Sequence, residues 1–189
     1  MMYNSIMAKE LSRELEELVK SDEFDPDTSE KFLQRISEGN LTRDEEPYTH
    51  FCVYFAAFDP LKNNVFVGHH RKSGLWLFNG GHIDEGESLS EALEREISEE
   101  WGVKIPVEDL KRPLLITVTE IPPNQKQVCR THYDIWYFVP SNEDTASFNQ
   151  DLLTKEFFKN SWLTLPDARS RITDPSTLKA LVLLEQRLK

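Results

Sequence analysis

Apolar residues recur at helical spacing near both ends of the chain. Leucines alternate with charged residues over 5–20, which predicts an amphipathic helix. A capping signal at 27–30 and the pair Gly39-Asn40 mark the start and end of a second helix. Another apolar face predicts a C-terminal helix over 176–188. We therefore expect a helical segment before the main body of the protein and a helix at its end.

The middle of the chain is rich in aromatic and β-branched runs that are typical of strands. The predicted strands cover residues 50–58, 65–67, 75–78, 114–119, 131–139 and 157–163. One helix is predicted among them, over 88–101, and residues 140–150 are a polar loop. This order predicts an α+β fold with a sheet between helices.

The net charge of −11 is unevenly distributed. Residues 1–46 carry 13 acidic and 6 basic residues, and residues 81–103 carry 8 acidic residues and 1 basic residue. The remainder carries 12 acidic and 15 basic residues. Extended nucleic acid and anionic membranes require a basic surface, so the composition disfavours both as partners. The slightly basic remainder is compatible with a small anionic ligand.

Two cysteines, Cys52 and Cys129, lie far apart in apolar segments. This argues against a disulfide framework and a cysteine-based zinc site, and it predicts two small buried side chains in a reducing cytoplasm. No apolar run approaches the ~20 residues of a membrane helix. Charged residues interrupt the start of the chain, so we expect no signal peptide and a cytoplasmic protein.

The helix predicted between the strands carries two kinds of acidic residue. At ~100° per residue, Glu96, Glu99 and Glu100 fall within an arc of about 100°, beside the apolar stripe that must face the core. Glu91 and Glu94 fall on the opposite side, which we expect to face solvent. A Glu-rich helix is most often simply a solvated face, so the first group needs a further explanation.

A divalent cation offers that explanation. Like charges three or four residues apart destabilise a helix by roughly 0.2–0.5 kcal/mol per pair, and partial burial raises the cost. Oxygen ligands favour Mg²⁺ or Mn²⁺ over Zn²⁺, and Arg95 is placed to neutralise part of the cluster. The preceding Gly80-Gly81 pair permits close backbone approach to a ligand, and Glu87 is within reach of the same ion.

The same segment matches a known spacing of residues. A glycine is followed after five residues by a glutamate, and after seven more by Arg-Glu-apolar-x-Glu-Glu-x-Gly-apolar. The matching residues are Gly81, Glu87, Arg95, Glu96, Ile97, Glu99, Glu100, Gly102 and Val103. This complete pattern resembles the signature of the Nudix hydrolase family. Asn79, where many members have proline, departs from the family outside the defining positions.

The resemblance covers roughly residues 47–189 and leaves an N-terminal helical arm, residues 1–46, outside it. It implies a Nudix-type α/β/α sandwich around a mixed sheet. It also implies Mg²⁺- or Mn²⁺-dependent hydrolysis of a diphosphate bond in a nucleoside diphosphate linked to another group. Mapped onto this chain, the metal would be held by Glu87, Glu96, Glu99, Glu100 and the carbonyl of Gly81. Glu96 would be a candidate for activating water, and Arg95 would orient the carboxylates.

Residues that select the substrate are less clearly marked. A basic cluster at 69–72 precedes Trp76, and we expect it to meet phosphates through Arg71, with His69 and Trp76 beside it. A solvated loop is the alternative interpretation. In the strand predicted over 131–139, successive side chains point to opposite faces of the sheet, which places Asp134 on one face with three other side chains. We expect one of these two faces to lie in the core.

Two other functions stay open. One is a catalytically silent nucleotide-binding or regulatory module, although such a module would be expected to lack one of the carboxylates. The other is an isoprenoid-diphosphate isomerase on the same scaffold, for which we find no second signature. The arm of residues 1–46 also offers a route to a homodimer.

Overall fold

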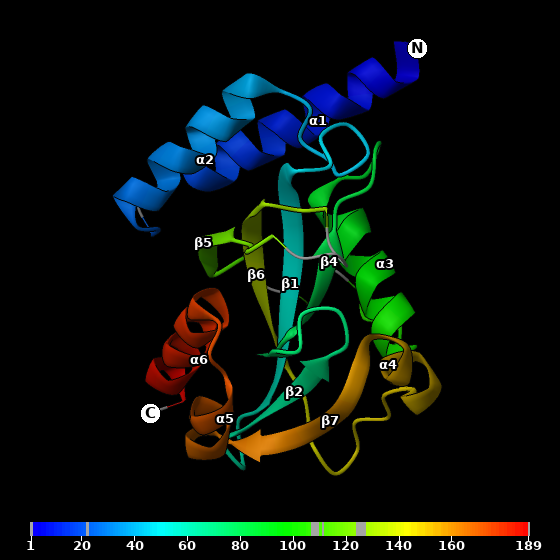
Figure 1. Cartoon of the computed structure of the whole chain (residues 1–189), viewed down its shortest axis with the longest axis vertical. Helices are drawn as coiled ribbons and strands as arrows, with labels where there is room; N and C mark the ends of the chain where they lie inside the picture. The colour runs from blue at the N-terminus through cyan, green and yellow to red at the C-terminus, as the bar shows by residue number, and fades with distance from the viewer. Residues whose placement is uncertain (1, 22, 107–109, 111, 124–127, 189) are drawn as a thin grey trace.

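The chain folds into a mixed sheet between two layers of helices (Figure 1). The computed structural model describes residues 2–21, 23–106, 110, 112–123 and 128–188. The helices are α1 (Met2–Val19), α2 (Pro26–Glu38), α3 (Leu89–Trp101), α4 (Gln150–Glu156), α5 (Leu165–Arg171) and α6 (Pro175–Arg187). The strands are β1 (Thr49–Asp59), β2 (Asn64–His70), β3 (Trp76–Leu77), β4 (Asn79–His82), β5 (Leu115–Glu120), β6 (Thr131–Pro140) and β7 (Phe157–Thr164).

Within the described ranges, seven strands form one sheet in which β1 is central. The strand order is β3-β2-β1-β6-β5, while β4 pairs with β1 and β7 pairs with β2. Strands β1 and β6 run parallel, with His50 opposite His132. The β1–β4 pair is antiparallel, with His82 opposite Cys52. Segments that are far apart in the sequence therefore become neighbours on β4, β1 and β6.

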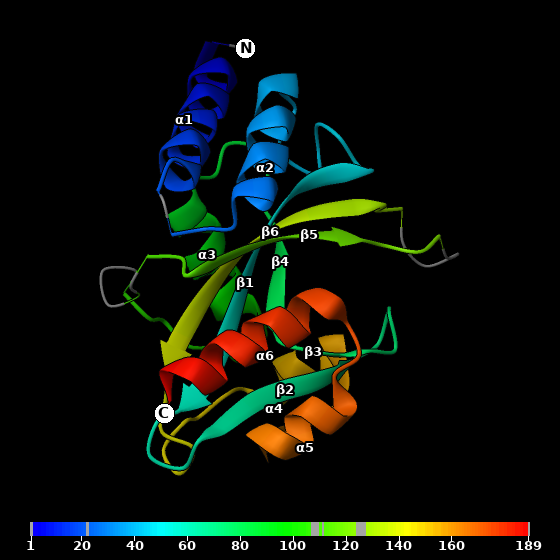
Figure 2. The same cartoon turned by 90° about the vertical axis from the view of Figure 1, so that its left-hand side faces the viewer.

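Helices cover both faces of the sheet (Figure 2). On one face, Phe51, Val53 and Phe55 of β1 share a core with α1, α2 and α3. On the other face, Trp136 and Phe138 of β6 share a core with α5 and α6. This confirms the predicted α/β/α sandwich. It corrects the expectation that only one face of 131–139 is core, because β6 is an interior strand with a helical layer on each side.

The helical arm packs onto the sheet of its own chain. Phe32 of α2 is fully buried, and its ring centroid lies 5.5 Å from that of Phe51 and 5.2 Å from that of Tyr133. Arg35 donates hydrogen bonds to the Thr49 carbonyl of β1 and to two carbonyls just after α2. The boundary between residues 1–46 and 47–189, and pairing of two copies through this arm, stay predictions.

Helix α4 was not predicted; Asn149 caps it by accepting hydrogen bonds from the N–H groups of Asp151 and Leu152.

Across the described residues, no helix is both long and apolar enough to cross a membrane.

Candidate active site

Helix α3 is placed by signals at its two ends. Ser88 accepts a hydrogen bond from the Glu91 N–H at 3.3 Å, and the Glu91 carboxylate accepts one from the Ser88 N–H at 2.9 Å. Gly102 ends the helix in the left-handed conformation, with φ of 68°, which favours glycine. These caps fix which side chains of α3 face the sheet.

The acidic residues of α3 divide as the helical geometry predicts. Glu96 and Glu100 are buried, at 8% and 7% exposure, whereas Glu91 and Glu94 are exposed. Glu99 lies at the edge of the buried pair with 62% of its side chain exposed. Two carboxylates are therefore held against the core and a third borders them in contact with solvent.

Arg95 joins this cluster to the preceding loop. Its guanidinium donates hydrogen bonds of 2.7 and 2.8 Å to the two oxygens of Glu87, and one of 2.7 Å to Glu96. It also donates to the His82 carbonyl at 2.8 Å and lies 3.4 Å from Glu99. The carboxylate partners raise the pKa of Arg95 above its ordinary value. Arg95 thus contacts two of the predicted metal ligands, Glu87 and Glu96, and its orienting role stays a prediction.

Glu100 has a different partner, Asn79, which lies outside the defining positions of the sequence pattern. The Asn79 side-chain amide donates to Glu100 Oε2 at 2.5 Å, and both side chains are buried. Burial raises the pKa of Glu100 well above its usual range, and the Asn79 hydrogen bond opposes that rise. Burial also raises the pKa of Glu96, opposed chiefly by Arg95. Both carboxyls therefore lack full compensation for their buried charge.

Gly81 lies directly against the Glu96 carboxylate. A Cβ atom at this position would come within 2.2 Å of Glu96 Oε1, so only glycine fits here without moving Glu96. Carboxylate and backbone carbonyl oxygens are the donors that Mg²⁺ and Mn²⁺ prefer, and the Glu96 and Glu100 carboxylates are buried without full compensation of their charge. The residues present therefore fit a hard divalent ion.

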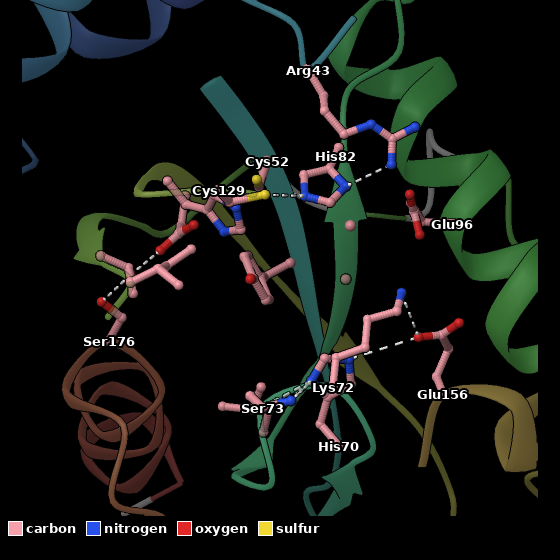
Figure 3. A pocket seen from close by; sticks show the side chains of 18 of the residues that line it. Arg43, Cys52, His70, Lys72, Ser73, His82, Glu96, Cys129, Glu156 and Ser176 are labelled. Carbon is pink, nitrogen blue, oxygen red and sulfur yellow. Dashed lines mark hydrogen bonds and ion pairs between the residues drawn. The ribbon is translucent and has the colours of Figure 1, made fainter. Parts of the chain in front are cut away.

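The carboxylates line a cavity of about 1300 Å³. Figure 3 shows Glu96 of α3 on one side of it, Ser176 of α6 on the other, and His82 between them. His70 and Lys72 also line the cavity and lie near Glu156, with Nε2 and Nζ at 3.7 and 3.3 Å from its carboxylate. The hydrogen bond from His70 and the charge of Lys72 lower the pKa of Glu156 to about 2, although burial opposes them.

The floor of the cavity contains a buried polar network on β5 and β6. Trp136 Nε1 donates to Thr117 Oγ1 at 2.8 Å, and Thr117 Oγ1 donates to Asp134 Oδ2 at 3.0 Å. Thr119 also donates to Asp134 Oδ2, while Asp134 Oδ1 is buried without a hydrogen-bond partner. Burial raises the pKa of Asp134 to about 7. Beside this network, the rings of Tyr54 and Trp136 stack on each other, with their centroids 4.6 Å apart.

The predicted substrate residues of the 69–76 segment lie outside the cavity lining. Arg71 donates to the Thr154 carbonyl at 2.7 Å and stacks on Phe158 at 4.6 Å. The ring of His69 stacks on that of Trp76, with centroids 5.6 Å apart. Their role in binding stays a prediction, whereas the adjacent His70 and Lys72 do reach the cavity.

A cluster of three imidazoles, which the sequence pattern does not predict, borders the cavity through His82 and His132. His50, His82 and His132 have ring centroids 4.8 to 5.2 Å apart. Burial, followed by the neighbouring histidines, lowers the pKa of His82 to about 2, and burial likewise lowers that of His132 to about 3. The rings are therefore neutral at ordinary pH. Both cysteines, Cys52 and Cys129, are free and buried as predicted, and both border this cluster.

Comparison with known proteins agrees with this geometry. Residues 49–182 match the NUDIX domain family. An 8-oxo-dGTP diphosphatase from Buchnera aphidicola subsp. Schizaphis graminum is 44% identical over 48 residues, which are 23% of this chain. The chain spans only 37% of the length of that curated relative.

Solved structures resemble this one in fold. A MutT protein from Methanosarcina mazei Go1 superposes with a TM-score of 0.54 and 17% identity, over 75% of this chain and 96% of that one. The NUDIX domain of Shewanella oneidensis NrtR, solved with ADP ribose, gives a TM-score of 0.52 and 18% identity. That match covers 74% of this chain and 88% of the other.

Proposed function

The chain belongs to the NUDIX domain family, and from that premise we propose that it is a hydrolase of pyrophosphate bonds and propose its substrate class. The substrate is a small nucleotide derivative in which a nucleoside diphosphate is linked to another group. The diphosphate bond of that molecule is cleaved with Mg²⁺ or Mn²⁺ bound to the protein. The proposal is supported by buried carboxylates that border a cavity also lined by basic and aromatic side chains.

The metal ligands in this proposal come from α3 and from the loop before it. They are Glu87, Glu96, Glu99, Glu100 and the carbonyl of Gly81. A divalent ion supplies neutralisation of the phosphoryl oxygens and a lowered pKa of bound water. Arg95 holds the Glu87 and Glu96 carboxylates in place through hydrogen bonds of 2.7 to 2.8 Å. Glu96 is the candidate that accepts the proton of the attacking water.

Other cavity residues fit the remaining parts of such a substrate. Lys72 and His70 offer positive charge and hydrogen-bond donors for phosphate oxygens. The unpartnered Oδ1 of Asp134, beside Trp136, offers a polar contact for a nucleobase. Arg71, His69 and Trp76 would then act at the rim, beyond the cavity lining.

One observation carries this proposal: Glu96 and Glu100 are both buried against the cavity with raised pKa values, and Gly81 leaves room for the Glu96 carboxylate. The test is hydrolysis of a panel in the presence of Mg²⁺. The panel contains 8-oxo-dGTP and ordinary nucleoside triphosphates, ADP-ribose, dinucleotide polyphosphates and nucleotide sugars. Released phosphate, pyrophosphate and mononucleotides identify the bond that is cleaved.

We expect turnover of at least one compound, abolished by EDTA and by Glu100→Gln. Glu94→Gln is the matched control, because Glu94 lies on the exposed side of the same helix. Tight binding of a panel compound without cleavage would overturn the proposal and favour the silent nucleotide-binding module. Interconversion of isoprenoid diphosphates without nucleotide cleavage would favour the isomerase instead.

A further inference from the structure

Four potential metal ligands converge on one face of three adjacent strands. His50 and Cys52 are two residues apart on β1, so their side chains point to the same face of the sheet. His132 of β6 lies opposite His50, and His82 of β4 lies opposite Cys52. Strand pairing therefore brings together three imidazoles and one thiol from distant parts of the sequence.

The spacing of these groups is close to that of a single coordination sphere. One ligand atom from each of His50, Cys52, His82 and His132 can be chosen so that all four lie within 4.8 Å of one another. Tetrahedral zinc, with bonds of about 2.0–2.3 Å, places its ligand atoms about 3.3–3.8 Å apart. Side-chain movements of about 1 Å would close the difference.

The hydrogen bonding leaves ligand atoms available. Nε2 of His50 and Nε2 of His132 are buried without a hydrogen-bond partner. Nδ1 of His50 lies 2.9 Å from the Glu46 carbonyl, which can only accept, so Nδ1 carries the proton and Nε2 has a free lone pair. A backbone carbonyl in this position is the usual outer partner of a metal-bound histidine. Unpartnered buried nitrogens cost free energy that coordination would recover.

We propose that His50, Cys52, His82 and His132 form a site for one borderline-soft divalent ion of the Zn²⁺ class. Nitrogen and sulfur ligands favour Zn²⁺, Co²⁺ or Ni²⁺ over Mg²⁺. The site is distinct from the carboxylates of α3, because Gly81 faces Glu96 while the adjacent His82 belongs to the imidazole cluster. Figure 3 shows His82 with Cys52 and Cys129 on one side and Glu96 across from them.

Two side chains outside the proposed ligand set contact the ring of His82. Arg43 Nη1 lies 3.3 Å from His82 Nδ1, and Cys129 Sγ lies 3.6 Å from His82 Nε2. Coordination through Nε2 places the ring proton on Nδ1, so Arg43, which is half-exposed and pairs with Asp84, turns away. The Cys52 thiol loses its proton to solvent on binding, as cysteine ligands do.

Co²⁺ is the probe for this site, added to protein from which metals have been removed with a chelator. We expect one equivalent of Co²⁺ to produce a near-ultraviolet thiolate charge-transfer band and strong visible bands, and Zn²⁺ to displace it. Cys52→Ser should remove the charge-transfer band, and His132→Gln should weaken Co²⁺ binding at least 10-fold. Circular dichroism verifies that each variant is folded.

Three matched variants serve as controls. Cys129→Ser retains the charge-transfer band, because its thiol is outside the proposed set. His69→Gln retains Co²⁺ affinity, because His69 stacks on Trp76 away from the cluster. Glu100→Gln abolishes hydrolysis and keeps the band, which separates this site from the proposed function. Absence of the band in the folded wild type, or its persistence in Cys52→Ser, would overturn the proposal; His132→Gln decides the case if Cys52→Ser does not fold.

Discussion

The side-chain amide of Asn79 donates a buried hydrogen bond of 2.5 Å to the Glu100 carboxylate, which connects β4 to α3. Burial raises the pKa of this carboxyl well above its usual range, and the hydrogen bond from Asn79 opposes that rise by favouring the ionised form. Asn79 is the position at which this chain departs from many of its family. The departure therefore bears directly on one of the proposed metal ligands.

Removal of that hydrogen bond should weaken metal binding. A hydrogen bond to a charged group contributes about 1.5–3 kcal/mol, so we expect Asn79→Ala to raise the Mg²⁺ concentration for half-maximal hydrolysis about 10- to 100-fold. Asn64→Ala is the control, because Asn64 donates a similar bond of 2.7 Å to Glu143 away from the cavity lining. An unchanged Mg²⁺ requirement in Asn79→Ala would refute the role of this amide.

Gly81→Ala tests the close approach between β4 and α3. The added methyl group would lie 2.2 Å from Glu96 Oε1 and must displace that carboxylate. A shift of about 1 Å in a catalytic group can cost about 10²-fold in rate, so we expect kcat to fall by one to two orders of magnitude. In Gly74→Ala, which adds a methyl group in open space at φ +71°, only backbone strain is introduced. That control should lose stability and keep its kcat.

Asp134 should make stability depend on pH. Its pKa is about 7 in the folded protein and 3.8 when unperturbed, so between these values the folded state holds a proton that the unfolded state releases. Stability contributed by this group is therefore present below pH 4 and is lost as pH rises towards 7, at up to about 1.4 kcal/mol per unit.

Urea unfolding of the wild type and Asp134→Asn between pH 4 and 8 measures this effect. The difference between the two curves removes the opposing contribution of His82 and His132, whose lowered pKa values reduce stability as pH falls. We expect the stability of Asp134→Asn relative to the wild type to increase with pH in this window. A flat difference curve would show that Asp134 is not buried as described.

Phe32 tests the attachment of the helical arm. Its ring is fully buried against Phe51 and Tyr133, so Phe32→Ala should reduce the free energy of unfolding by about 3–5 kcal/mol. The adjacent Leu33 is 41% exposed, and Leu33→Ala should cost less than about 0.5 kcal/mol. Chemical denaturation of both variants makes the comparison. Equal stability of the two would mean that the arm is not part of the core.

Local sequence alone determined the helix that carries the carboxylates. A capping box at Ser88, a left-handed stop at Gly102 and a period of 3.6 residues are sufficient to place Glu96 and Glu100 on the inner side. All of these interactions span a few residues. The predicted elements followed from such patterns, and the α/β/α layers followed from the resemblance of residues 81–103 to the family signature.

Only the tertiary structure decided which residues meet across strands. The pairing of β1 with β4 and β6 places His82 and His132 beside His50 and Cys52, although no short-range spacing connects them. Asn79 likewise meets Glu100 only because β4 packs beside α3. Register between distant segments depends on how the whole core packs, so periodicity along the chain predicts the faces of each element and leaves their partners undetermined.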